Sequence, residues 1–147
     1  MSAPKRSAKD AGALTGTEQR AVKQAAAEAR RTAGGKNTEH DVLAAIAAMD
    51  ESDRAIAEGL HTLVKRVAAD LTPRTWYGFP AYAKDGKVVL FFQFAGKFRT
   101  RYGHIGFQDT AHLDDGTLWP TAYAITSWNQ ANEHAIEGLI RRALRPR

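Results

Sequence analysis

The chain of 147 residues contains no cysteine, and this absence excludes several kinds of site at once. Disulfides, metal centres with thiolate ligands and cysteine nucleophiles are all ruled out. Long apolar runs are lacking too, since no stretch approaches the ~20 residues that a membrane-spanning helix needs. The basic start, with Lys5, Arg6 and Lys9, is not followed by the apolar segment of a secretory signal. We therefore expect a cytoplasmic protein with no membrane partner.

Two familiar motifs of nucleotide-binding and hydrolytic proteins are missing as well. Gly34-Gly35-Lys36 has neither the preceding strand nor the spacing of a phosphate-binding loop, and we interpret it as a helix end. Ser127 does not belong to a G-x-S-x-G nucleophile elbow. The sequence therefore supports no catalytic residue, and we expect no cofactor. An enzyme stays an open alternative, because residues that are distant in sequence can meet in the fold.

Acidic residues are scarce at the N-terminal end, and the net charge of +5 originates there. Residues 1–36 contain eight basic and three acidic side chains, whereas residues 37–147 contain thirteen of each. Such asymmetry indicates either an anionic partner, such as nucleic acid, or a tail that only keeps the protein soluble. We predict that residues 1–36 form a basic, partly disordered arm with an Ala-rich helix over 17–33. We expect residues 37–147 to form one domain that folds without the arm. Whether the helix over 17–33 docks on this domain is left open by the sequence.

Apolar spacing predicts further helices in the domain. Val42, Ile46 and Met49 follow helical periodicity and indicate a helix over 38–49. A longer apolar stripe predicts a helix over 53–71, which ends because a residue before proline disfavours helical geometry. A closing helix is expected from Ser127 or Asn129 to Leu144.

Between these helices, aromatic and β-branched residues predict strands. We expect strands over 75–83, 88–94, 98–107 and 118–126, with a hairpin turn at Asp85-Gly86. Helices and strands are thus segregated along the chain, which favours an α+β class over alternating β-α-β units. The predicted architecture is an antiparallel sheet of about four to five strands with amphipathic helices packed on one face.

The segment Tyr77-Gly78-Phe79-Pro80, followed by Asp85-Gly86-Lys87-Val88, resembles the YdhG-like family of uncharacterised domains. The resemblance covers roughly residues 52–145 and rests on that block and on the order of the elements. It implies a frataxin-like α+β sandwich, and it carries no general catalytic motif.

Relatives of this kind have been proposed to deliver iron by analogy with frataxin, which would require an acidic helix ridge. In this chain the corresponding helix carries Asp53, Glu58 and Asp70, offset by Arg54, Lys65 and Arg66. This departure from the pattern disfavours iron delivery.

Aromatic residues provide the first candidate site. Aromatic side chains favour strands and cores in general, but a concave group of them can also line a ligand pocket. The candidate ligand-binding residues are Trp76, Tyr77, Trp119 and Tyr123.

Basic residues provide the second candidate site. Arginines that alternate along a strand beside exposed aromatics could hold single-stranded nucleic acid or another anion, and the alternative is an ordinary solvated surface. The candidate anion-binding residues are Lys5, Arg6, Lys9, Arg30, Arg31, Arg99 and Arg101.

A third cluster of polar residues could in principle bind a divalent cation. It consists of His104, Asp109, His112, Asp114 and Asp115, of which His112, Asp114 and Asp115 are the closest in sequence. No recognised ligand spacing is present, and Asp114-Asp115-Gly116 is typical of a turn.

Two functional hypotheses from different classes follow. The first is a non-enzymatic binding or accessory domain for a small molecule or a protein. The second is a nucleic-acid-associated protein that binds through the basic arm, with an affinity that falls steeply in salt. The sequence does not determine the partner or the oligomeric state.

Overall fold

The computed structural model describes residues 15–146, which form five helices and one sheet. The helices are α1 (Gly16–Ala33), α2 (Glu39–Ala47), α3 (Glu51–Val67), α4 (Ala95–Phe98) and α5 (Gln130–Ala143). The strands are β1 (Thr72–Trp76), β2 (Phe79–Lys84), β3 (Lys87–Gln93), β4 (Gly103–Phe107) and β5 (Ala122–Ile125). The predicted α+β class is confirmed. Within this part of the chain, no helix is both long and apolar enough to cross a membrane.

The strands of the sheet stand in sequence order, and every neighbouring pair is antiparallel. The predicted Asp85-Gly86 hairpin is confirmed, since Lys84 pairs with Lys87 across the turn. Both turn residues have positive φ, 51° and 78°. Two adjacent left-handed residues are typical of a type I′ turn, whose twist matches that of the strands it joins.

The strand predicted over 75–83 is wrong, because the chain reverses direction in its middle. Tyr77 and Gly78 have φ values of 53° and 85° and form a turn between β1 and β2. Trp76 consequently pairs with Phe79 across this turn. A tyrosine in the left-handed region is uncommon, which is why residue preferences alone did not indicate a turn here.

β3 agrees with its prediction to within one residue, whereas the last two strands are shorter than predicted. The strand predicted over 98–107 begins only at Gly103, because α4 ends at Phe98 and residues 99–102 belong to neither a helix nor a strand. The Asp53 carboxylate stabilises the helical turn of α4. Its two oxygens accept hydrogen bonds from the N–H groups of Ala95, at 3.2 Å, and Gly96, at 3.0 Å. The last strand begins at Ala122 and not at residue 118.

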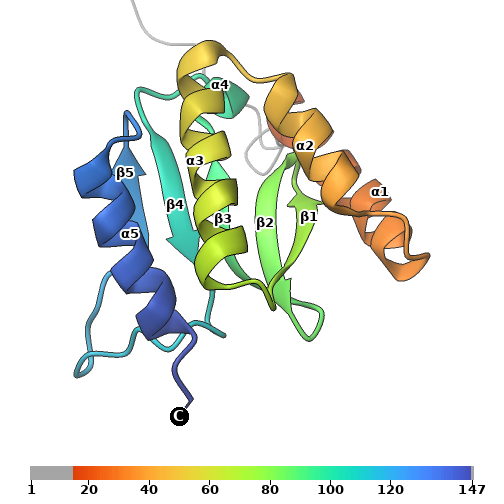
Figure 1. The fold of residues 1–147 in the computed structure, drawn as a ribbon. Helices are drawn as coiled ribbons and strands as arrows, with labels where there is room; N and C mark the ends of the chain where they lie inside the picture. The colour runs from red at the N-terminus through yellow and green to blue at the C-terminus, as the bar shows by residue number, and fades with distance from the viewer. Residues whose placement is uncertain (1–14, 147) are drawn as a thin grey trace, which may run out of the picture.

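The hydrophobic core lies between the sheet and three helices, since α2, α3 and α5 cover one face of the sheet (Figure 1). Alternate strand residues point to that face, where they meet the apolar sides of the helices. The largest fully buried side chains of this core are Val42, Ile56, Leu60, Leu63, Val64, Tyr82, Leu90, Phe92, Ile105 and Ile140. α1 lies beside β1, at the edge of the sheet (Figure 1).

Candidate functional site

The sheet face that is turned away from α2, α3 and α5 carries a second set of aromatic side chains, and we call it the outer face. Strand register places on it Arg74, Trp76, Phe79, Ala81, Phe91, Gln93, His104, Gly106, Ala122 and Ala124. None of the five strands contains an aspartate or a glutamate. At the β5 end the floor of this face consists of small exposed residues, Ala122 and Ala124.

Four rings form an aromatic cluster on the outer face: Trp76, Tyr77, Phe79 and Phe91. The ring centroid of Trp76 lies 5.3 Å from that of Phe91 and 5.8 Å from that of Phe79, in edge-to-face geometry. Tyr77 stacks on Phe79 at 6.1 Å. Phe79 is buried under the other rings, whereas Tyr77 is 36% exposed. The cluster is thus packed against the sheet on one side and exposed to solvent on the other.

A shallow pocket of about 250 Å³ lies at this cluster, and Gln93 and Phe98 complete its lining. The position of Phe91 depends on Gly106, because a Cβ at that glycine would come within 2.3 Å of the Phe91 ring. Because Gly106 has no side chain, the Phe91 ring can lie directly against the backbone of β4. Pockets of this kind, with apolar walls and one amide, suit a flat apolar ring.

A second aromatic group, a pair of rings, lies on the same face toward β4. The rings of Tyr102 and His104 are 5.1 Å apart, and the Arg101 guanidinium lies 4.9 Å from the centre of the Tyr102 ring. His104 pairs with Gln93 in the sheet, so the amide of Gln93 lies between this pair and the aromatic cluster. Phe91, Phe98 and Tyr102 were not among the residues predicted from the sequence. Alternation along β3, with Phe92 in the core, is the signal that could have indicated Phe91.

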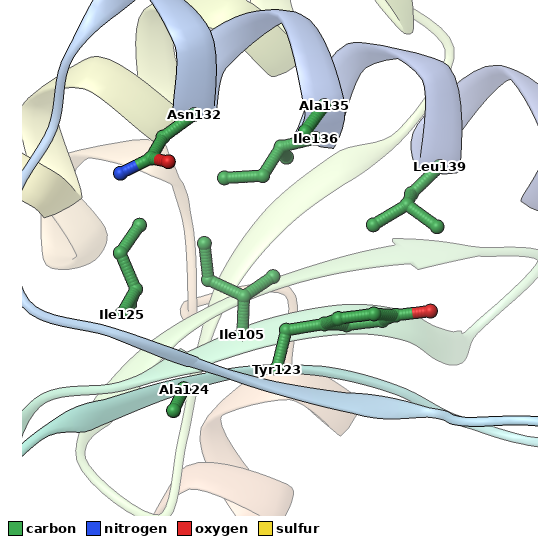
Figure 2. A pocket seen from close by; sticks show the side chains of 8 residues that line it. All are labelled: Ile105, Tyr123, Ala124, Ile125, Asn132, Ala135, Ile136 and Leu139. Atoms are coloured by element: carbon green, nitrogen blue, oxygen red, sulfur yellow. The ribbon is translucent and has the colours of Figure 1, made fainter.

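The four predicted ligand-binding residues lie in three different places. Trp76 and Tyr77 belong to the aromatic cluster. Trp119 packs near Phe107 and lines a separate open depression. Tyr123 lies on the helix-covered side, in a small cavity of about 170 Å³ between β5 and α5 (Figure 2).

The cavity in Figure 2 is lined almost entirely by apolar side chains, among them Ile136 and Leu139 of α5. Its one amide, that of Asn132, already donates a hydrogen bond to the carbonyl of Ser127 at 2.9 Å. This mostly apolar cavity thus continues the hydrophobic core between β5 and α5.

The described part of the predicted arm docks on the domain. The buried Glu28 carboxylate of α1 accepts a hydrogen bond from the N–H of Gly78 at 2.9 Å. Asn37, the first residue after the arm, accepts from the N–H of Thr75 at 3.0 Å and donates to its carbonyl at 2.9 Å, and it also donates to Thr32 of α1 at 3.1 Å. Lys97 donates to the Gln24 side chain at 2.7 Å. Both Gly78 and Lys97 adjoin the aromatic cluster in sequence or space, so α1 borders the candidate site.

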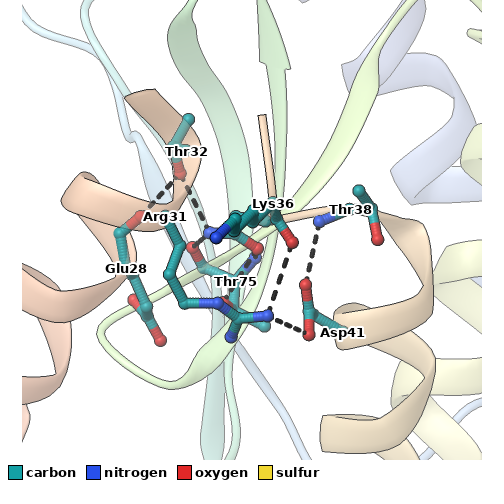
Figure 3. Close-up of polar contacts among 8 residues, drawn as sticks. Glu28, Arg31, Thr32, Lys36, Thr38, Asp41 and Thr75 are labelled. Atoms are coloured by element: carbon teal, nitrogen blue, oxygen red, sulfur yellow. Dashed lines mark hydrogen bonds and ion pairs between the residues drawn. The ribbon is translucent and has the colours of Figure 1, made fainter. Parts of the chain in front are cut away.

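The predicted anion-binding residues are dispersed. Lys5, Arg6 and Lys9 lie outside the described residues. Arg30 is exposed on α1, whereas Arg31 forms an ion pair with Asp41 at 2.7 Å (Figure 3). Hydrogen bonds from the N–H of Thr38 and from Arg31 lower the pKa of Asp41, which keeps this pair charged. Arg99 and Arg101 are exposed; Arg99 follows Phe98 of the pocket in sequence, and Arg101 lies over the Tyr102 ring.

The polar residues considered for a metal do not converge. His104 belongs to the outer face, His112 Nδ1 contacts the carbonyl of Arg145, and Asp114 and Asp115 are exposed. Gly116 has a φ of 70°, in agreement with a turn at this position. Within residues 15–146, no three His, Asp or Glu side chains are grouped closely enough to hold a metal ion.

One polar chain that sequence reasoning missed links three elements. His61 Nε2 lies 2.8 Å from Glu39 Oε1, and His61 Nδ1 lies 2.9 Å from the hydroxyl of Tyr82. Burial raises the pKa of Tyr82 well above its ordinary value. The Tyr82 side chain is fully buried, so no substrate can reach its hydroxyl. These hydrogen bonds therefore connect α2, α3 and β2.

Comparisons with known proteins add no assignment: no family model matches the chain, and searches of curated proteins and of solved structures return no significant match. The outer face must therefore be interpreted from its own chemistry.

Proposed function

We propose that this chain is a non-enzymatic binding domain whose ligand surface is the outer face of the sheet. The observation that carries the proposal is the aromatic cluster, which packs on the side of the sheet that α2, α3 and α5 leave uncovered. Aromatic rings in such a position normally belong to a core, and when they stay accessible they commonly mark a binding surface.

The surroundings of the cluster favour a ligand with a flat ring and an anionic group. Apart from the β2–β3 turn, where Asp85 lies between Lys84 and Lys87, residues 72–104 contain four basic side chains and no acidic one. The nearby Glu28 carboxylate of α1 is buried against Gly78. A flat ring can stack on Trp76 or Tyr77, and Arg74 or Arg99 can form an ion pair with an anionic group.

Uridine 5′-monophosphate is a probe that contains both features. In an amide-resolved NMR titration of the full chain, we expect shifts at the cluster and around Gln93. Trp76→Leu should abolish these shifts. Trp119→Leu, which removes another partly exposed indole elsewhere, should leave them unchanged.

A second variant guards against misfolding of the first. Tyr77→Asn removes an exposed ring at a left-handed position that asparagine tolerates, and it should weaken binding without unfolding the domain. Shifts that are equal in the wild type and in both cluster variants, or no shifts at all, would contradict the proposal.

A further inference from the structure

The aromatic cluster and the Tyr102–His104 pair lie on the same face of the sheet. Their outermost members are three strand spacings apart. The cluster begins at Trp76 on β1, and the pair ends at His104 on β4. Because neighbouring strands are ~4.8 Å apart, the two groups together span roughly 14 Å. This full span from Trp76 to His104 is wider than a single stacked base.

We infer that the outer face binds single-stranded RNA, whose successive bases stack on the aromatic cluster and on the Tyr102–His104 pair. This inference rests on the proposed function and extends it from a single flat ring to a chain of nucleotides. Roughly two to three bases would be held, as is usual for a sheet that uses aromatic side chains to stack bases.

Charge complementarity supports a polyanion. Arg74 lies on the outer face, Arg99 follows Phe98 of the pocket, and Arg101 stacks on Tyr102, so cations flank both aromatic groups. The strands supply no carboxylate to repel phosphates. Stacking platforms bordered by cations are the usual means of holding single strands.

The polar groups between the two stacking positions favour RNA over DNA. The amide of Gln93 and the ring nitrogens of His104 are neighbours in the sheet, and both residues are partly exposed. An amide and a neutral imidazole can each donate and accept hydrogen bonds, as the ribose 2′-hydroxyl does.

The test compares uridine 5′-monophosphate with uridine oligomers of increasing length, using the full chain at low salt. We expect affinity to rise roughly ten-fold or more from the monophosphate to the tetramer, since a second stacked base contributes. Deoxyuridine oligomers should bind more weakly. Tyr102→Ala should remove most of the gain with length but leave monophosphate binding at Trp76 intact.

Two charge variants separate the outer face from the arm. Replacing Arg99 and Arg101 by glutamine should reduce the slope of log affinity against log salt by about 1.4 for a uridine octamer, which corresponds to two phosphate contacts. Lys5→Gln, Arg6→Gln and Lys9→Gln together should leave the length dependence unchanged. Abolition of oligomer binding by the arm variant alone would overturn the inference.

The remaining outcomes are also distinct. If the monophosphate binds at the cluster but oligomers bind no tighter, the inference fails and the proposed function stands. If deoxyuridine oligomers bind as tightly as uridine oligomers, the assignment to RNA fails. If neither monophosphate nor oligomers bind, both proposals fail.

Discussion

Glu28 shows how one side chain couples the N-terminal helix to the candidate site. Its Oε1 accepts the N–H of Gly78, but Oε2 is buried and has no hydrogen-bond partner among the described residues. Burial raises the pKa of Glu28 above its ordinary value of 4.5, although the hydrogen bond from Gly78 acts in the opposite direction. The side chain thus holds the β1–β2 turn at the cost of a partly desolvated charge.

This residue should make stability depend on pH above the ordinary carboxyl range. A raised pKa means that the folded state holds the proton more tightly than the unfolded chain. Its stabilising effect is therefore present below about pH 4.5 and is lost as the pH rises through the raised pKa. Glu28→Gln should remove this slope, so that the variant gains stability relative to the wild type as the pH rises. Urea unfolding between about pH 5 and pH 8 measures the difference.

That pH range avoids the other shifted carboxyls. Hydrogen bonds from His61 lower the pKa of Glu39, and hydrogen bonds from Arg66 lower that of Glu137, so their contributions are lost only as the pH falls below about 4.5. Glu18→Gln, on the same helix but exposed, is the matched control and should keep the wild-type slope. Equal slopes in all three proteins would contradict the role given to Glu28.

At the scale of elements, the sequence predicted those helices and turns whose signal lies within the element itself. The stripe of Ile56, Leu60 and Leu63 indicated α3, and the Asp85-Gly86 pair indicated its hairpin, since both signals are local. The Tyr77-Gly78 turn and α4 were missed because distant carboxylates, Glu28 and Asp53, stabilise them.

The candidate site was predictable only in part for a related reason. Trp76 and Tyr77 were recognised as aromatic residues at a strand end. Their partners Phe91 and Tyr102 come from other strands, and only the sheet register brings them to the same face. Register depends on pairing between strands, which composition and spacing within one strand do not specify.

Asp53 should be essential for α4. Asp53 is 6% exposed and its carboxylate accepts two backbone N–H groups, and the amide of Asn would turn a donor toward one of them. We expect Asp53→Asn to lower the free energy of unfolding by about 1–3 kcal/mol and to speed amide exchange at Gly96. Glu51→Gln removes an exposed charge from the same helical turn and should cost less than about 1 kcal/mol. Equal losses would mean that α4 does not depend on the Asp53 hydrogen bonds.

For the whole molecule, the described contacts revise the picture of an arm attached to an independent domain. The main core cluster lies wholly beyond residue 36, and Ala21 is the one buried apolar residue of α1, which favours a folded domain without α1. However, Glu28 and Gln24 contact the β1–β2 turn and Lys97, and these contacts connect α1 to the sheet. The helix is therefore expected to stabilise the domain without being required for folding.

A chain that starts at Asn37 tests this expectation. We expect it to unfold cooperatively, with α2, α3 and α5 intact by circular dichroism, but with a free energy of unfolding lower by about 1–3 kcal/mol. The loss should lie toward the lower end, because water can reach the Gly78 N–H once α1 is absent. Arg30→Gln in the full chain, an exposed change on α1, should have no effect. An unfolded product would mean that α1 is required for folding. Unchanged stability would mean that α1 contributes no net stabilisation. Either result would contradict the expectation that α1 stabilises the domain without being required.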